Sequence, residues 1–374
     1  MISNCEIIHF TLYNLRIDEV NMEQIITKNK SKSIKFIAVC LMITYHLFAF
    51  PARIVEVSYN SLFEIGGQTI EFYISRAGGI CVGMFTFLSG YGLYISYNKN
   101  ISYKGIFKRI YNFYKKYWLV FFIFILGGFV LGKYKFNLTQ FILNFIGLED
   151  SYNGEWWYVR LYIMLLLSYP IINKILDRYN YKFVLIISFL INIGGYGITT
   201  LSAIFNIKFR LLALLALLLG GQFLFILGVV IAKYGLFNSL NEKINIKRKT
   251  YIYLSIVTFF IIVFIEDILV IGEIAKLILI PIFVFTLVNA IKDESYLSKL
   301  GRHSTNMWLT HSFFCYYYFQ RFTFILKYPI LILLQLIVIT IIVSIILEKI
   351  EEVFLSKLNI FNRKIIWIEK TLNK

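Results

Sequence analysis

The feature that most constrains this chain is a series of long apolar runs. A helix that crosses a bilayer needs about 20 mostly apolar residues, and runs of that kind lie near residues 34–52, 77–97, 116–132, 155–173, 183–201, 211–232, 250–265, 271–290, 305–326 and 329–347. Of the 374 residues, 59% are hydrophobic and only 16% are charged, which excludes a soluble protein. We therefore expect an all-α, polytopic membrane protein with about ten transmembrane helices.

Lysine and arginine residues are distributed unevenly among the segments that join these runs. If both termini are cytoplasmic, 28 of the 38 Lys and Arg residues lie on the cytoplasmic side, nine lie outside and Arg160 lies within a run. Membrane proteins carry such an excess on their cytoplasmic loops, so the pattern predicts cytoplasmic termini. The net charge of +17 then requires no nucleic acid partner. A basic cytoplasmic face also suits anionic membrane lipids or a phosphorylated cofactor.

The runs divide the chain into three parts. Residues 1–31 form a polar cytoplasmic N-terminal segment, residues 32–347 form the transmembrane domain and residues 348–374 form a basic cytoplasmic tail. Within the domain, residues 137–147 are apolar but too few to span a membrane, and they predict a re-entrant or interfacial helix. The four cysteines lack the spacing of metal ligands, so we expect neither a metal site nor a disulfide framework.

Three polar side chains lie deep within the runs. His46 follows Lys35 by eleven residues, which at 1.5 Å per residue places it about 16 Å further along a helix, near the middle of the bilayer. His311 and Ser89 come to a similar depth on other runs. An intramembrane histidine is a functional candidate, with a hydrogen bond between helices as the alternative role. Ser89 lies among aromatic residues and glycines and is better explained as a packing residue.

A second polar group opens the fourth run at the outer face. It comprises Glu155, Trp156, Trp157, Tyr158 and Arg160. Aromatic residues at the end of a helix commonly form an interfacial belt. An arginine inside the membrane also needs a partner, which Glu155 or an anionic substrate would supply. Glu155, Trp156, Trp157 and Arg160 are therefore candidate substrate-binding residues, with the aromatic belt as the alternative.

Basic and aromatic residues alternate over residues 104–116, at the start of the third run. Such a segment is typical of an anchor at the membrane interface. Lys108 and Arg109 would equally suit phosphate groups, because charge-assisted hydrogen bonds to phosphate are strong. Both interpretations stay open.

Several segments, taken in order, resemble the signatures of the acyltransferase type 3 family, membrane-bound O-acyltransferases that modify bacterial surface polysaccharides. They are Lys35 with His46, residues 79–94, residues 108–118, residues 155–158 and residues 301–311. The resemblance covers most of the chain, from Lys32 to His311. The family commonly has an arginine in place of Lys35, an aspartate in place of Lys32 and an arginine in place of Asn112. Lysine keeps the positive charge of arginine but loses its bidentate geometry, so these departures bear on the donor site.

The resemblance implies transfer of an acyl group, most often acetyl, from cytoplasmic acyl-CoA to a hydroxyl of a glycan or lipid-linked polysaccharide at the bacterial plasma membrane. Acetyl-CoA is the expected co-substrate. His46 would act as base or nucleophile, since neutral imidazole does either, and His311 is the second catalytic candidate. The candidates for holding the phosphates of CoA are Lys35, Lys108, Arg109 and Arg302.

Two other functions also suit a basic, aromatic-rich polytopic protein. A transporter of glycans or lipid-linked sugars would favour carboxylates within the membrane, and the runs place none near their middle. Glu266, Asp267 and Glu273 are assigned instead to a solvated outer loop. A scaffold for polysaccharide assembly would need none of the buried polar groups. Hydrolysis of acyl-CoA by the purified protein would separate an enzyme from both alternatives.

Overall fold

The computed structural model describes residues 24–55, 57–97, 102–266 and 268–372. Most of the polar segment expected over residues 1–31 lies outside these ranges. The described part is almost entirely helical, and its only sheet is a two-stranded antiparallel hairpin. The prediction of an all-α membrane protein is thereby confirmed.

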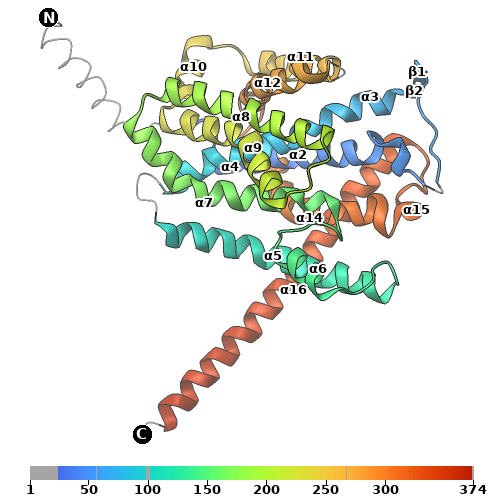
Figure 1. Cartoon of the computed structure of the whole chain (residues 1–374), viewed down its shortest axis with the longest axis vertical. Coiled ribbons are helices and arrows are strands. Elements are labelled where there is room, and N and C mark those ends of the chain that lie inside the picture. The colour runs from blue at the N-terminus through green and yellow to red at the C-terminus, as the bar shows by residue number, and fades with distance from the viewer. Residues whose placement is uncertain (1–23, 56, 98–101, 267, 373–374) are drawn as a thin grey trace, which may run out of the picture.

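The elements follow one another along the chain with short connections (Figure 1). The first half contains α2 (Lys28–Phe48), η1 (Pro51–Arg53), β1 (Glu64–Ile65), β2 (Gln68–Thr69), α3 (Ile70–Arg76), η2 (Ala77–Ile80), α4 (Cys81–Tyr97), α5 (Tyr103–Val130), α6 (Leu138–Phe145), η3 (Gly154–Trp156), α7 (Trp157–Arg178) and α8 (Tyr181–Ile204). The second half contains α9 (Arg210–Lys233), α10 (Leu236–Ile244), α11 (Arg248–Ile265), α12 (Leu269–Ala290), α13 (Tyr296–Gly301), α14 (Ser304–Ser312), η4 (Phe313–Tyr317), α15 (Gln320–Thr323) and α16 (Pro329–Leu372).

Nine helices of the described part are long and apolar enough to cross a membrane, and they coincide with nine of the ten predicted runs. The run at residues 305–326 is not one long helix, because α14, the π-helical segment η4 and α15 divide it. It nevertheless runs alongside α2 for the length of that helix. Gly301 packs against the backbone of Lys32, and Gln320 Nε2 donates to the carbonyl of Arg53 at 2.8 Å. The broken segment thus packs along α2 within the bundle, and the nine long apolar helices make the protein a multi-pass membrane protein.

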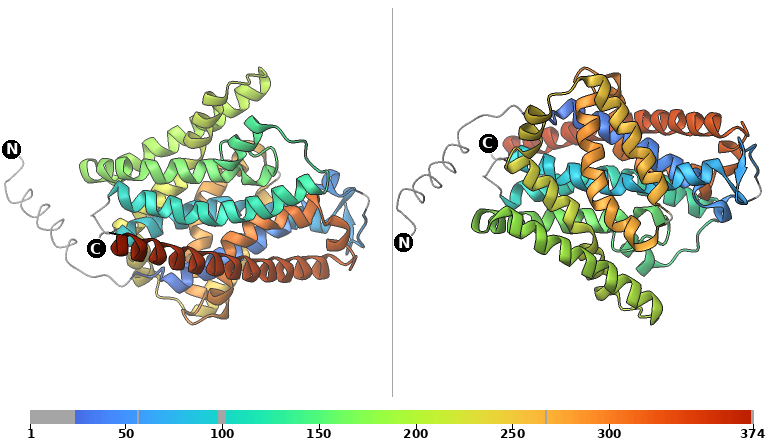
Figure 2. Two further views of the ribbon diagram at one scale, coloured as in Figure 1. Left: turned by 90° about the horizontal axis from the view of Figure 1, so that it is seen from below. Right: turned by 90° about the horizontal axis from the view of Figure 1, so that it is seen from above.

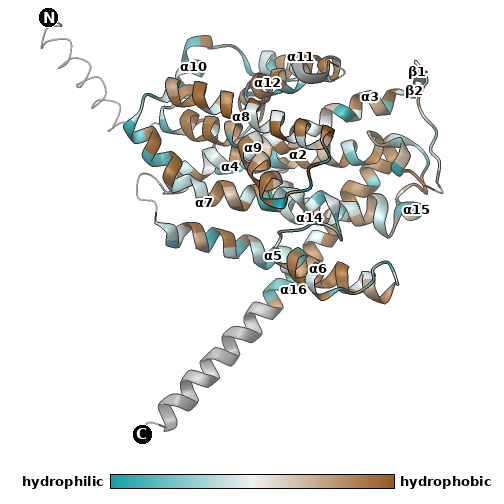
Figure 3. Ribbon diagram, viewed as in Figure 1, coloured by the Kyte–Doolittle hydropathy of each residue, from teal (hydrophilic) through white to brown (hydrophobic). Residues whose placement is uncertain are grey.

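The long helices lie roughly side by side, so the bundle has two ends (Figures 1 and 2). The β1–β2 hairpin and α15 mark one end, called here the hairpin end. The starts of α2 and α5 mark the other, called here the basic end. Hydrophobic residues dominate the helices, and hydrophilic residues gather near their ends (Figure 3). This pattern is the one expected when lipid surrounds the middle of a bundle.

Helices α4 and α9 approach closely because each has a glycine at the crossing. A Cβ at Gly90 would collide with the carbonyl of Phe225, and one at Gly228 would collide with the carbonyl of Phe87. Small residues at such crossings let backbones touch and increase packing contacts in lipid. The contact fixes α4 and α9 as one wall of the central cavity.

Helix boundaries follow local capping. Ser102 caps α5 by accepting a hydrogen bond from the amide of Gly105, so the basic residues 104–116 lie on the same helix as the third run. The run predicted as a re-entrant or interfacial helix is the eight-residue helix α6, whose first amides are capped by Asn137. The tail expected from residue 348 continues the backbone of α16 as helix.

Candidate active site

A cavity of about 750 Å³ lies inside the bundle between α2, α4, α5, α7, α9 and α12. Lys35 and Arg109 line it toward the basic end, and His46, Arg53 and Glu155 line it toward the hairpin end. The rise of α2 separates Lys35 from His46 by about 16 Å. One cavity therefore connects a cationic region with a region that contains a histidine and a carboxylate.

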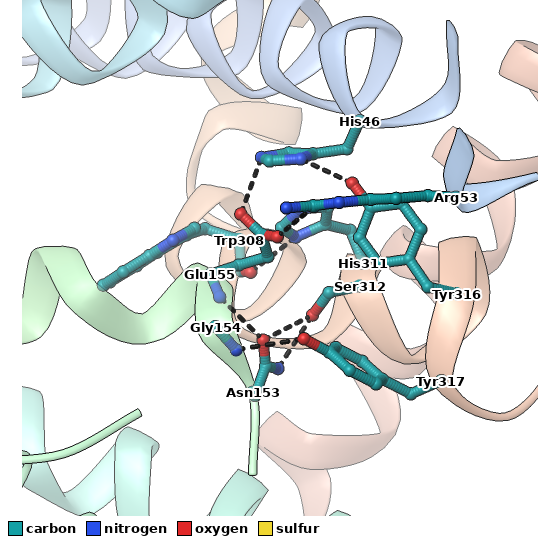
Figure 4. A network of polar contacts seen from close by, with 10 residues as sticks. All are labelled: His46, Arg53, Asn153, Gly154, Glu155, Trp308, His311, Ser312, Tyr316 and Tyr317. Carbon is teal, nitrogen blue, oxygen red and sulfur yellow. Dashed lines mark hydrogen bonds and ion pairs between the residues drawn. The ribbon is translucent and has the colours of Figure 1, made fainter. Parts of the chain in front are cut away.

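Both ring nitrogens of His46 have hydrogen-bonding partners (Figure 4). Nε2 lies 3.2 Å from Glu155 Oε2, and Nδ1 lies 2.6 Å from the hydroxyl of Tyr316. A carboxylate accepts and a phenol donates, so this arrangement favours the tautomer with its proton on Nε2 and a lone pair on Nδ1. Because α2 ends at Phe48, His46 lies in its last turn. It therefore lies toward the hairpin end of the bundle, and its depth in the bilayer stays a prediction.

The second oxygen of Glu155 binds an arginine. Oε1 accepts a hydrogen bond from Arg53 Nη1 at 2.8 Å, and the guanidinium also packs on the rings of Phe50 and Tyr316. Glu155 is buried whereas 46% of the Arg53 side chain is exposed. Arg53 thus places a positive charge at the edge of the cavity, next to the carboxylate that contacts His46.

Tyr316 owes its position to a break in helix geometry. The helix α14 changes at Phe313 into the π-helical segment η4, which includes Tyr316 and Tyr317. A π-turn shifts the side chains that follow it relative to an α-helix, and such turns occur frequently at functional sites. Tyr316 reaches His46, while the Tyr317 hydroxyl accepts from the amide of Gly154 at 3.0 Å.

His311 lies against His46, with 4.9 Å between the ring centroids. Its Nδ1 is 2.7 Å from the carbonyl of Trp308, within its own helix. Its Nε2 is fully buried and has no hydrogen-bonding partner in the described part of the chain. The alternative role proposed for this residue, a hydrogen bond between helices, is therefore not observed. His311 packs behind His46 and does not line the cavity.

Two hydrogen bonds join residues 153–156, just before α7, to α14, and a third lies within residues 153–156. Asn153 Nδ2 donates to Ser312 Oγ at 2.8 Å, the Asn153 carbonyl-type oxygen Oδ1 accepts from the amide of Glu155 at 3.1 Å, and Trp156 Nε1 donates to the carbonyl of Leu309 at 3.0 Å. Together they hold Glu155 opposite His46 (Figure 4). Trp156 is only 1% exposed and does not line the cavity, so its role here is in packing.

At the basic end, the structure separates the four residues predicted to hold phosphates. Lys35 and Arg109 line the cavity, and Arg109 Nε donates to the hydroxyl of Tyr162 at 3.4 Å. Neither forms an ion pair with another described residue. Lys108 is exposed and does not line the cavity, and Arg302 forms an ion pair with Glu348 at 2.8 Å outside the cavity. Of the four predicted phosphate-binding residues, the structure therefore places only Lys35 and Arg109 in the cavity.

Arg160 has a partner other than those expected. Its guanidinium binds Asp150 Oδ2 at 3.1 Å and the carbonyl of Leu148 at 3.3 Å, so neither Glu155 nor a substrate is needed to balance its charge. It lines a separate cavity of about 300 Å³. Of the aromatic residues beside it, Trp157 and Tyr158 line the central cavity. Substrate contact by Trp157 stays a prediction, whereas Arg160 lies outside that cavity.

Two of the three acidic residues assigned to a solvated outer loop, Glu266 and Glu273, line the cavity. Lys276 Nζ binds Glu266 Oε1 at 3.2 Å and Glu273 Oε1 at 2.5 Å, and all three residues face the cavity. Asp267 lies outside the described residues. The assignment to a loop was wrong for Glu273, which lies on α12, although 52% of its side chain is exposed. The solvated assignment was wrong for Glu266, whose side chain is 12% exposed because the end of α11 packs near α3.

Sequence patterns do not single out Arg53 or Tyr316. Arg53 follows the first apolar run directly, where a basic residue usually anchors a helix at the interface. Tyr316 is one of three consecutive tyrosines in a chain with 27. Both reach His46 only through the turn after α2 and the π-helical segment, which no pattern in the sequence indicates.

The comparisons with known proteins identify a family for this chain. The sequence model of the family described as an acyltransferase domain matches residues 31–349. No curated protein and no solved structure matches the chain.

Proposed function

The chain belongs to the acyltransferase type 3 family, and from this premise we propose that it transfers an acyl group, in the first instance acetyl, from acyl-CoA to a hydroxyl of a cell-surface or exported polysaccharide. One observation carries the proposal: a single cavity holds a histidine bound to a carboxylate and two cations that have no anionic partner in the part of the chain that the structure describes. The cations suit the phosphates of CoA. The histidine suits removal of a proton from a hydroxyl.

The reaction places the acceptor hydroxyl at His46 Nδ1. The imidazole takes the hydroxyl proton while the oxygen attacks the thioester carbonyl; the carbon–sulfur bond then breaks and the CoA thiolate takes the proton. Glu155 stabilises the imidazolium, and Arg53 holds Glu155 in place. The Tyr316 hydroxyl occupies Nδ1 in this structure, so it must move aside or pass the proton on. If His46 instead carries the acyl group, the same nitrogen is the nucleophile.

The arm of CoA that carries the thioester must extend from the phosphates at Lys35 to His46, about 16 Å along α2. Between these points the cavity is lined by aromatic rings, among them Phe113, Tyr158 and Trp308. Phe113 and Trp308 stack with 6.0 Å between centroids, and Tyr158 packs on Trp308 at 5.6 Å. An apolar passage excludes water, which would otherwise hydrolyse the thioester.

The basic end is proposed to face the cytoplasm of a bacterial cell, where acyl-CoA is made. The distribution of basic residues in the sequence supports this orientation. Single cysteines introduced into residues 133–150, which join α5 to α7, should react with an impermeant reagent added outside the cell. If that segment reacted only with reagent on the cytoplasmic side, the orientation would be the reverse of the one proposed. The basic end would then face away from the cytoplasmic acyl-CoA.

A transporter of glycans is the second candidate, and one observation favours it. Glu155, Glu266 and Glu273 all line the cavity, so the carboxylates expected of a coupled transporter are present after all. Each of these carboxylates forms an ion pair with Arg53 or Lys276. Such pairing suits a carboxylate that is held in a fixed position better than one that relays protons. Mass spectrometry of surface polysaccharide from deletion and complemented strains tests the acyltransferase. If glycan reaches the surface in normal amounts but lacks acyl groups in the deletion strain, the transporter is excluded.

A further inference from the structure

The second cavity, of about 300 Å³, is lined by three basic side chains. Arg160 comes from the first turn of α7, Lys208 from the connection between α8 and α9, and Arg210 from the start of α9. Of the 38 Lys and Arg residues, only nine fall in the segments proposed to lie outside the cell, and Lys208 and Arg210 are two of these. Because basic residues are sparse on that side of a membrane protein, their convergence on one cavity calls for a reason.

The charged groups around this cavity leave a surplus of one positive charge. Glu149 also lines it and forms an ion pair with Arg210, and Asp150 forms an ion pair with Arg160 at 3.1 Å. Lys208 is exposed and forms no ion pair with any residue that the structure describes. Three cations and two carboxylates therefore meet here, and Lys208 supplies the surplus.

The side chains that face this cavity are accessible to a ligand. The Arg210 side chain is 55% exposed, and its guanidinium, which has five N–H donors, uses one of them on Glu149. Phe209 lies between the two cations in the sequence, also lines the cavity and is 61% exposed. Donors beside an exposed aromatic ring are suited to bind a sugar that carries a negative charge.

The second cavity adjoins the proposed catalytic region, because Leu217 of α9 lines both cavities. Arg160 follows Glu155 by five residues, which corresponds to about 8 Å along η3 and the first turn of α7. Asp150, the partner of Arg160, lies close enough to Glu155 to interact with it electrostatically. Since Glu155 lies 3.2 Å from His46, a chain of sugars bound in the second cavity extends readily to a hydroxyl at His46.

We propose that the second cavity is a subsite for the acceptor glycan, and that it binds the carboxylate of an acidic sugar such as a uronate. The inference rests on the proposed function and adds the charge of the acceptor and the place where that charge is held. Lys208 and Arg210 donate charge-assisted hydrogen bonds to the carboxylate, and Phe209 packs on the sugar ring. A surplus of one positive charge matches a carboxylate better than a phosphate monoester, which carries about 1.5 to 2 negative charges.

The experiment presents the acceptor in two charge states. Polysaccharide extracted from a deletion strain is used in its native form and with its carboxylates reduced to alcohols, and transfer from radiolabelled acetyl-CoA is measured with the purified protein in neutral detergent. Lys208→Gln and Arg210→Gln should each raise the Michaelis constant of the native polysaccharide about fivefold, because each removes a hydrogen bond to a charge that solvent partly screens. The Michaelis constant of the reduced polysaccharide should be the same in both variants and in wild type.

Lys135→Gln is the matched control. Lys135 is also exposed, lies on the connection between α5 and α6, and lines neither cavity. Its replacement should leave the Michaelis constant of the native polysaccharide within about twofold of wild type, and a rise as large as that in Lys208→Gln would refute the subsite in favour of a general attraction. Arg210→Gln breaks an ion pair, whereas Lys208→Gln breaks none among the described residues, so the second variant tests the subsite even if the first fails to fold.

Anionic phospholipid is the other source of a single negative charge. If phosphatidylglycerol raises the melting temperature of wild type but not of Lys208→Gln, and both forms of the polysaccharide are acylated equally, the cavity binds lipid and the proposal is wrong. A native polysaccharide that contains no carboxylate and is nevertheless acylated would refute it as well.

The donor reaction separates the subsite from the proposed function. Hydrolysis of acetyl-CoA without acceptor should proceed at the same rate in Lys208→Gln and in wild type. Equal transfer to the native and the reduced polysaccharide would refute the subsite while leaving the acyltransferase intact. A wild-type protein that neither hydrolyses acetyl-CoA nor acylates either polysaccharide would refute the proposed function and the subsite with it.

Discussion

The two ends of the cavity hold their charged groups in opposite ways. At the hairpin end every polar atom of the His46 and Glu155 side chains has a partner supplied by the protein, from Arg53 or Tyr316 or from each other. At the basic end Lys35 and Arg109 lie close enough to repel each other and have no anionic partner among the described residues. The polar groups at the hairpin end are therefore fully paired within the protein. The cations at the basic end have no anion to pair with among the described residues.

This difference indicates what each end has to do. A catalytic group works best when its hydrogen bonds already hold it in the reactive geometry, because no reorganisation is then needed during the reaction. A binding site for a multiply charged donor works best when its cations are unpaired, because each phosphate then replaces a repulsion with an attraction. Substitutions at the hairpin end should therefore affect turnover, and substitutions at the basic end should affect donor affinity.

The largest effect is expected from His46→Ala, which removes the group that the rest of the hairpin-end network orients. Loss of a general base typically lowers the rate by 10² to 10⁴, whereas loss of one hydrogen bond between membrane helices averages only about 0.6 kcal/mol of stability. Acyl transfer should fall to background while the protein remains in the membrane in near-normal amounts. Glycan acylation near wild-type levels in this variant would show that the active site does not lie at the hairpin end.

His311→Ala is the companion to that experiment. It deletes a ring that packs on His46 without lining the cavity. Turnover should fall less than in His46→Ala, with the Michaelis constants for both substrates unchanged, because the remaining imidazole keeps its two partners.

Glu155→Gln should have the next largest effect. The amide keeps the size of the side chain but no longer stabilises an imidazolium, and it leaves Arg53 without its counter-ion. A hydrogen bond to a charged group contributes about 1.5–3 kcal/mol, so turnover should fall roughly 10- to 100-fold. Steady-state kinetics should show this in kcat, with the Michaelis constant for acyl-CoA within twofold of wild type. Glu149→Gln removes a carboxylate paired with Arg210 outside the central cavity and serves as the control.

Arg109→Ala tests the basic end. Loss of one charge-assisted hydrogen bond to phosphate should raise the Michaelis constant for acyl-CoA about tenfold and leave kcat unchanged. Dephospho-CoA esters offer a second measurement, since a donor with fewer phosphates should lose less affinity in the variant. If kcat falls instead, Arg109 acts on the reaction and the division between the two ends is wrong.

The sequence predicts the bundle well because the membrane restricts the chain so strongly. Runs of the right length must become helices, and nine of the ten do so as continuous helices. The prediction of a single helix over residues 305–326 was wrong because a π-turn breaks the run. Amino-acid composition gives no signal for a π-turn. That same break positions Tyr316.

The candidate site is only half predictable. His46, Glu155, Lys35 and Arg109 are recognisable because a charged or titratable side chain in an apolar run needs an explanation. Arg160 meets the same criterion but is satisfied locally by Asp150, ten residues earlier in the chain. A sequence shows that a buried charge needs a partner, but which partner depends on how the helices rotate and cross.

The smallest effect is expected from Lys108→Ala, which completes the comparison at the basic end. Lys108 and Arg109 are neighbours on α5, and consecutive residues of a helix point about 100° apart. Arg109 therefore lines the cavity while Lys108 is exposed. Because Lys108 does not line the cavity, its loss removes no donor contact there, and the Michaelis constant for acyl-CoA should change less than about twofold. Because the two variants remove the same charge from the same helical turn, a general attraction of acyl-CoA to the basic face would weaken donor binding equally in both. Only a tenfold difference between them, measured in the same detergent and salt, assigns phosphate binding to the cavity.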